Sequence, residues 1–256
     1  MNKNLIIPHD KYPTDKPVPY VYQVNKSDRI LVFFGAKHSF DVADTQFKLL
    51  KEKWLEFLTV TNRKNCLVFY EAKLPNINLT REEEIINKFG EAGLIRYLAE
   101  KNNIESLSPE PPPELEIREL LKKYDAKLLS FFYFLRSLSS LLKNKKGNQF
   151  WVKADGLLEK RKWPDTDFSL DNTKTLFKEI FNKELDPIYE GTIINAVNPT
   201  RKDSVVNEIA RESSSIRNEY VLKKIEEYWA QDKNLFIVYG VGHAIVLEPA
   251  IRQLSE

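Results

Sequence analysis

The segment RILVFFGAKHSF, residues 29–40, places five apolar residues before a glycine and a histidine three positions after that glycine. The segment NLFIVYGVGHAI, residues 234–245, repeats this arrangement, with the apolar run 235–239 before Gly240 and His243 after it. Short, continuous apolar runs that end at turn residues are typical of strands buried on both faces. The two segments therefore predict two core strands, each followed directly by a histidine.

The chain between these segments alternates between strand and helix patterns. A helix capped by Asp44 or Thr45 is expected after the first segment, and a capping box formed by Thr80 and Glu83 opens a second helix that runs to about Lys101. The order strand, helix, strand, helix, strand predicts a parallel sheet with right-handed crossovers. The expected fold class is α/β, with a partly parallel central sheet flanked by helices. Its strands are expected at 18–24, 29–34, 66–70, 104–108 and 235–239, and the first two form a hairpin.

The middle of the chain breaks this alternation. Residues 114–200 are rich in helix formers and are far longer than one crossover requires. We therefore expect a single α/β domain, 1–256, in which 114–200 is a helical insertion that caps the strand ends. A helix capped near Ser214 is expected to lead into the last strand. Trp151 and Trp163 are expected in a loop of the insertion, where aromatic rings suit a substrate-binding wall.

Composition excludes several classes of partner. The 256 residues carry 39 basic and 37 acidic side chains, so the formal net charge of +2 favours neither nucleic acid nor anionic lipid. No apolar run reaches the ~20 residues that span a bilayer, and Cys66 is the only cysteine. Neither a phosphate-binding loop nor a dinucleotide fingerprint is present. These features predict a cytoplasmic protein that binds neither nucleic acid nor membrane.

Polar side chains that follow the core strands are the candidate site. In parallel sheets the binding site lies at the carboxyl ends of the strands, where we expect His38, Glu71, Glu110 and His243 to meet. Two imidazoles and a carboxylate can hold a divalent metal that activates water, or they can act as a general base with its orienting partner. Each histidine taken singly is also compatible with a structural turn. The third, His9, is expected in a solvated tail.

Five segments resemble a known family. FFGAKHSFD, VFYEA, GEAGLIRYLAEKNNIESLSPEPP, RNEYVLKKI and IVYGVGH are similar to the TraB/Tiki-like branch of the superfamily that includes erythromycin esterases and the haem-binding ChaN proteins. The hallmarks of this branch are two GxxH motifs, a glutamate that ends the second core strand, and an arginine on the helix before the second motif. They fall here on Gly35 with His38, on Glu71, on Arg217, and on Gly240 with His243. An aspartate often follows the arginine, whereas this chain has Asn218.

The resemblance implies an α/β fold and several activities. Tiki members cleave peptides with a metal, other members hydrolyse a macrolide ester, and some bind haem. We expect a hydrolase of a peptide or ester bond in a peptide or small-molecule substrate. His38 and His243 would ligate a divalent metal (Mn, Co or Zn) or act as base and orienter, Glu71 would ligate the metal or polarise the water, and Arg217 would bind a substrate carboxylate or the oxyanion. Further substrate-binding candidates are Glu91, Glu110, Trp151 and Trp163. The alternatives are a non-catalytic ligand- or haem-binding protein that uses the same site, and a scaffold with a vestigial site.

Overall fold

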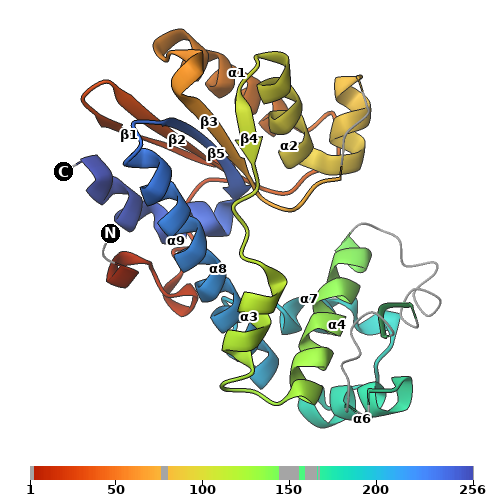
Figure 1. Ribbon diagram of the computed structural model, residues 1–256. Coiled ribbons are helices and arrows are strands. Elements are labelled where there is room, and N and C mark those ends of the chain that lie inside the picture. The colour runs from red at the N-terminus through yellow and green to blue at the C-terminus, as the bar shows by residue number, and fades with distance from the viewer. Residues whose placement is uncertain (1–2, 76–79, 144–155, 159–165, 167, 256) are drawn as a thin grey trace. The chain divides into compact units, whose positions relative to one another are not determined.

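The computed structural model describes residues 3–75, 80–143, 156–158, 166 and 168–255. It divides into two compact units, shown in Figure 1. The first unit contains the chain up to Pro111 and from Arg217 onward, and the second contains Pro112–Ile216. Among the described residues, no helix is long and apolar enough to cross a membrane.

The first unit contains a five-stranded sheet in the order β1-β2-β5-β3-β4. The β1–β2 pair is antiparallel, and the other three pairs are parallel. The α/β class with a partly parallel sheet is therefore confirmed, as is the N-terminal hairpin. The strands are β1 (Tyr20–Lys26), β2 (Arg29–Ala36), β3 (Cys66–Tyr70), β4 (Glu105–Leu107) and β5 (Asn234–Gly240).

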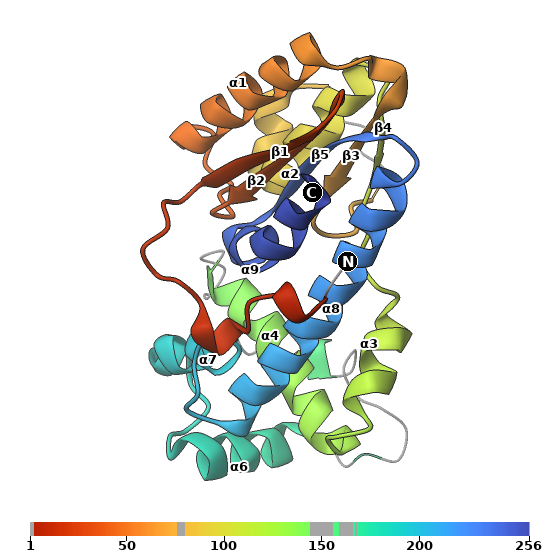
Figure 2. The same cartoon turned by 90° about the vertical axis from the view of Figure 1, so that its left-hand side faces the viewer.

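Helices cover both faces of this sheet (Figure 2). Along β2 successive side chains alternate between the faces, so that Val32 and Phe34 pack on one side and Leu31 and Phe33 on the other. The first side is covered by α1 (Thr45–Val60) and α2 (Glu82–Lys101). The second is covered by the C-terminal part of α8 (Val205–Trp229) and by α9 (Val241–Arg252).

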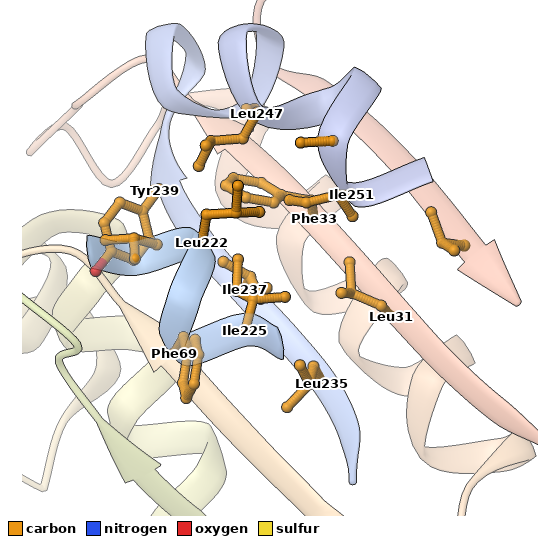
Figure 3. Close-up of a cluster of buried hydrophobic side chains, with 14 of the residues drawn as sticks. Leu31, Phe33, Phe69, Leu222, Ile225, Leu235, Ile237, Tyr239, Leu247 and Ile251 are labelled. Atoms are coloured by element: carbon orange, nitrogen blue, oxygen red, sulfur yellow. The ribbon is translucent and has the colours of Figure 1, made fainter. Parts of the chain in front are cut away.

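Apolar side chains fill the space between the second face and its helices. Figure 3 shows Leu222 and Ile225 of α8 and Leu247 and Ile251 of α9 directed toward the strands. The N-terminal residues Leu5, Ile6, Ile7 and Tyr12 also pack against this cluster. The N-terminal segment is thus part of the core of the first unit. The short 3-10 helices of this unit are Lys3–Leu5, His9–Lys11, Arg63–Asn65 and Gln253–Ser255.

The second unit is helical and has an apolar core of its own. Its elements are α3 (Pro113–Leu120), α4 (Ala126–Lys143), α6 (Leu170–Phe181), a 3-10 helix (Pro187–Tyr189), α7 (Glu190–Ala196) and the beginning of α8. Buried phenylalanines of α4 and α6 lie in this core, among them Phe131, Phe134 and Phe177. The unit extends beyond the expected insertion, 114–200, because the first part of α8 also packs into it. The capping of the strand ends by this segment stays a prediction.

Two helix starts differ from the sequence-based expectation. The second helix begins at Glu82 with Arg81 as its N-cap, so the expected Thr80–Glu83 capping box is wrong. Three glutamates in its first turn complement the helix dipole instead. The helix expected to start near Ser214 begins at Val205, because Val206, Ile209 and Ala210 are buried in the core of the second unit and extend it. The cap at Asp44 is confirmed, since its carboxylate accepts a hydrogen bond from the Gln46 N–H.

Candidate functional site

Glu71 lies at the centre of the candidate site. It directly follows β3, and its backbone N–H donates to the carbonyl of Val238 at 3.0 Å, so the neighbouring strand fixes its position. Its Oε2 accepts from the Gly240 N–H at 2.7 Å, and its Oε1 accepts from Arg217 Nη2 at 3.0 Å. Both carboxylate oxygens are therefore held in place.

Both strand-end histidines face this carboxylate. His38 Nε2 lies 3.6 Å from Glu71 Oε2, and His243 Nε2 lies 3.5 Å from Glu71 Oε1. The three side chains converge as the sequence predicted. Each imidazole thus approaches a different oxygen of one shared carboxylate.

Arg217 neutralises two partly buried carboxylates. Its Nε donates to Glu110 Oε2 at 2.8 Å, and its Nη2 donates to Glu110 Oε1 and Glu71 Oε1, both at 3.0 Å. Burial would by itself lower the pKa of Arg217, but the two glutamates raise it, so the guanidinium is charged at all physiological pH values. Glu110, expected to bind substrate, is the bidentate partner of Arg217 in this arrangement.

The charges around Glu71 also determine its ionisation. Burial would raise the pKa of this carboxyl, but His243, Arg217 and His38 more than offset burial and hold its pKa well below the ordinary value. Glu71 is therefore an anion that faces three nitrogen-bearing side chains.

His38 is an exposed imidazole with a buried partner. Its side chain is 55 % exposed, and its Nδ1 lies 2.5 Å from the buried carboxylate of Glu91. Because an ionised carboxylate only accepts hydrogen bonds, Nδ1 carries the proton in this contact. The backbone of His38 has φ 59°, a left-handed conformation that is uncommon for residues other than glycine.

A break in α2 brings Glu91 to His38. Gly90 has φ 59° and ψ −146°, which interrupts the helix just before Glu91. A Cβ atom at Gly90 would lie 2.8 Å from the carbonyl oxygen of Ser39, so only glycine lets the turn after β2 come this close. Glu91 contacts His38 and is 6 % exposed, and its expected role in substrate binding stays a prediction.

His243 is held in a different way. It lies in the first turn of α9, and its side chain is only 11 % exposed. Its Nδ1 donates to Asn218 Oδ1 at 2.5 Å, and its ring packs edge-on against Tyr239 with centroids 5.6 Å apart. The Nε2 atom of the ring faces Glu71 Oε1 at 3.5 Å.

Gly240 makes the close approach of these groups possible. A Cβ atom at this position would collide with His38 Nε2 and would lie 3.2 Å from Glu71 Oε2. Its backbone angles, φ −56° and ψ 146°, are open to any residue. The glycine is therefore required by the space that His38 occupies and not by the conformation of the chain.

The two histidines share one feature with metal-binding histidines. Histidines that bind metals commonly donate their other ring N–H to a carboxylate or carbonyl group, and both His38 and His243 do so. However, Glu71 is already paired with Arg217 and the Gly240 N–H. In the described part of the chain, no group of three or more His, Cys, Asp or Glu side chains is placed to hold a metal. The side chains as arranged do not fit a metal, and binding by His38, Glu71 and His243 stays a prediction.

Two polar residues of the site were not identified as functional from the sequence. Asn218, beside Arg217 in the chain, is fully buried and bonds to His243. His9 was expected in a solvated tail, which is wrong: it is buried, and its Nε2 lies 3.2 Å from Asn218 Nδ2. Burial follows from the packing of its apolar neighbours against the core. The only feature of the sequence that points to Asn218 is its position directly after Arg217, a candidate site residue. Trp151 and Trp163 lie outside the described residues.

No protein-family model, curated protein or solved structure matches this chain. The TraB/Tiki-like resemblance therefore stays a prediction that rests on the motifs themselves.

Proposed function

We propose that this protein is a hydrolase in which His38 activates a water molecule. The observation that carries the proposal is the exposed imidazole whose Nδ1 is fixed by a buried carboxylate. In its neutral form, an imidazole whose Nδ1 carries the proton has its lone pair on Nε2 and can take a proton from water there, which is the role of a general base. The left-handed backbone at His38 supports the same conclusion, because such strain concentrates at functional sites.

The neighbouring groups divide the remaining tasks. As water attacks the carbonyl carbon of an ester or peptide, its proton passes to His38 Nε2. When the tetrahedral intermediate collapses, the bond to the leaving oxygen or nitrogen breaks, and the imidazolium returns the proton to that atom. Glu91 orients the ring, and the Glu71 carboxylate, 3.6 Å from Nε2, stabilises the imidazolium between these steps.

Arg217 is the candidate for binding negative charge on the substrate. Its Nε and Nη2 atoms hold Glu110 and Glu71, whereas Nη1 takes part in none of these contacts. Nη1 is the part of the guanidinium that we assign to a substrate carboxylate or to the developing oxyanion. Metal binding by His38, Glu71 and His243 stays a prediction, and no step above requires a metal.

The same exposed side chain supports a second candidate function. An exposed imidazole is also suited to serve as the axial ligand of haem iron. A non-catalytic haem-binding protein would show a Soret band after reconstitution with haemin, and this band should disappear in His38→Ala. A hydrolase without this property would remain colourless.

A panel of activated esters and short peptides tests the hydrolase proposal. We expect kcat/KM of the best substrate to fall ~10²–10⁴-fold in His38→Ala, as for other general bases, and about 10-fold or more in Glu91→Gln. Two matched controls are Ser39→Ala, next to the base, and Glu100→Gln, an exposed glutamate on the same helix as Glu91. Both should retain activity, and loss in Ser39→Ala would instead indicate a serine nucleophile.

Metal analysis of the untagged protein accompanies this panel. Turnover that survives chelator and exceeds that of His38→Ala supports the proposed mechanism. Turnover that depends on a stoichiometric divalent metal would replace His38 as base with a metal-bound water. Activity that is equal in the wild type and in His38→Ala would contradict the hydrolase site altogether.

A further inference from the structure

Gln46, a buried residue in the first turn of α1, is bonded to the chain just before His38. It is 1 % exposed, and its Oε1 accepts from the Lys37 N–H at 3.1 Å. A backbone N–H group only donates, so the atom of Gln46 that faces it must be the carbonyl oxygen. The orientation of this amide is therefore fixed by the backbone of Lys37.

Lys37 is the first residue beyond the paired part of β2. The pairing of β2 with β1 extends to Gly35, and its pairing with β5 extends to Ala36. Beyond these registers Gln46 supplies the acceptor for the Lys37 N–H. The next residue, His38, leaves the strand direction with φ 59°. A left-handed backbone is unfavourable for a residue that has a Cβ atom, so neighbouring contacts must hold this turn.

A second contact between Lys37 and α1 constrains the backbone less. Lys37 Nζ lies 2.6 Å from Asp44 Oδ2, and the other oxygen of Asp44 caps the helix. The ammonium group is carried on a flexible four-carbon chain, so this ion pair is compatible with many backbone conformations. The bond from the Lys37 N–H to the buried Gln46 oxygen joins a donor and an acceptor that are both fixed. The Gln46 contact therefore determines the direction in which the chain enters His38.

The other end of the Gln46 amide shows that packing does not explain this residue. Its Nε2 atom is buried, and within the part of the chain that the structure describes it has no hydrogen-bond partner. A buried donor without an acceptor lowers stability. Methionine, which has a similar length and no donor, would fill the same space without this loss. The glutamine is therefore explained by the contact that its oxygen makes.

We propose that Gln46 is a positioning residue of the candidate site. By holding the Lys37 N–H, its oxygen keeps His38 in the left-handed conformation from which the ring reaches Glu91 and Glu71. Gln46 acts on the ring through the backbone of the turn. Its effect on turnover rests on the proposed function of His38, whereas its effect on the position of His38 does not.

NMR of the full-length protein with isotope-labelled histidine tests the inference. The chain has three histidines, so single substitutions assign their signals. The Cα and Cβ chemical shifts of a residue distinguish a left-handed from an extended backbone. In Gln46→Met we expect these shifts of His38 to move toward extended values, while those of His9 and His243 stay in place. Unchanged His38 shifts in Gln46→Met would overturn the inference. Gln46→Leu provides the same measurement if methionine prevents folding.

Three further variants identify the atom responsible. Gln46→Glu retains an oxygen that can accept from the Lys37 N–H and should retain the His38 shifts. Lys37→Met removes the ion pair but keeps the N–H, so it should move the His38 shifts less than Gln46→Met does. An equal movement would overturn the inference, because the ion pair would then hold the turn. Lys48→Met introduces the same side chain at an exposed position of α1 and should leave the His38 shifts unchanged.

Urea unfolding separates positioning from a structural role. Because Gln46→Met removes the buried donor Nε2, its unfolding midpoint should equal or exceed that of the wild type. A clearly lower midpoint would overturn the inference, since Gln46 would then be retained for stability.

Kinetics on the best substrate of the panel form a separate arm. We expect kcat to fall about 10-fold or more in Gln46→Met with little change in KM, and to recover within about threefold in Gln46→Glu, because a misplaced base slows the chemical step. Unchanged kcat with moved His38 shifts would overturn the role of Gln46 in turnover. Absence of hydrolysis in the wild type would count against the proposed function alone, because the NMR experiment decides the position of His38 without any substrate.

Discussion

The turn after β2 and the turn after β5 each place a histidine three residues beyond a glycine, on neighbouring parallel strands. After β2 the chain enters a loop, and His38 takes a left-handed backbone with its ring 55 % exposed. After β5 the chain enters α9 directly, and His243 lies in a regular first turn with its ring 11 % exposed. The strand register contributes to this difference, since Gly240 pairs with Ala36 and not with Gly35.

The partners of the two rings differ as much as their exposure. His38 Nδ1 is held by the charged carboxylate of Glu91, and His243 Nδ1 by the neutral amide of Asn218. A carboxylate stabilises an imidazolium, whereas an amide fixes a ring without adding charge. The same spacing in sequence therefore gives two different histidines. The partner of His38 favours a charged ring, whereas the partner of His243 only fixes the position of its ring.

Arg217 should have the largest effect on stability, because it serves both turns through Glu71. In Arg217→Met the carboxylates of Glu71 and Glu110 lose their shared cation, which we expect to lower the free energy of unfolding by ~3–5 kcal/mol. Arg81→Met, which removes an exposed arginine with glutamate partners, should cost less than ~1 kcal/mol. Urea unfolding of both variants provides the measurement. Equal losses of unfolding free energy would mean that Arg217 stabilises its two glutamates no more than an exposed arginine stabilises its partners.

Acid should lower the free energy of unfolding by less than Arg217→Met does. Protonation neutralises the Glu71 carboxylate, but the side chains of its neighbours stay in place. The pKa of Glu71 in the folded protein lies well below its ordinary value of 4.5. Its stabilising contribution is therefore complete above about pH 4.5 and is lost as the pH falls through the lower, folded-state pKa. Unfolding measured from pH 7 to pH 3 should show this loss in the wild type. The loss should be absent in Glu71→Gln, and a similar acid dependence in that variant would assign the effect to other carboxylates.

Gly90→Ala should affect the His38 turn alone. The side chain would meet the Ser39 carbonyl at 2.8 Å on a backbone with φ 59°, for which we expect a cost of about 1–3 kcal/mol. The His38 ring signals should shift, and those of His243 should not. Gly191→Ala is the control, since a Cβ atom there would meet nothing within 4 Å outside its own helix and alanine favours a helix. A shift of the His243 signals as large as that of His38 would show that the two turns are not independent.

Gly240→Ala should have the smallest effect on stability, but it should displace the His38 ring. The new methyl group displaces the end of an exposed side chain and no backbone, so we expect a change below about 1 kcal/mol. The ring must leave Glu71, and hydrolysis should fall toward that of His38→Ala. Gly242→Ala, whose Cβ atom would meet only the Tyr12 ring at 3.9 Å, is the matched control. Full activity in Gly240→Ala would contradict the described position of His38.

Features that depend on local pattern could be predicted from the sequence. Apolar runs identified the core strands, the Asp44 cap marked the start of α1, and strand-end placement brought His38, Glu71 and His243 together. The carboxyl ends of parallel strands meet at one edge of a sheet, so this part of the site follows from topology alone.

The partners of these residues could not be predicted in the same way. The break at Gly90 occurs inside a segment with an ordinary helical pattern, and it is required by contact with Ser39, which is distant in sequence. The burial of His9 depends on α9, more than 200 residues further along the chain. No sequence pattern near Gly90 or His9 predicts these contacts. Each contact joins segments that come together only after the sheet has formed.

The position of β5 has a consequence for the order in which the protein can be assembled. This strand lies between β2 and β3, although it follows them in sequence by more than 160 residues. During synthesis β2 and β3 are therefore made more than 160 residues before the strand that pairs with both of them. Such non-local pairing slows folding and leaves strand edges exposed in the meantime. Until β5 is inserted, Glu71 lacks the Gly240 N–H, His243 has not been made, and no shorter nascent chain can contain the site.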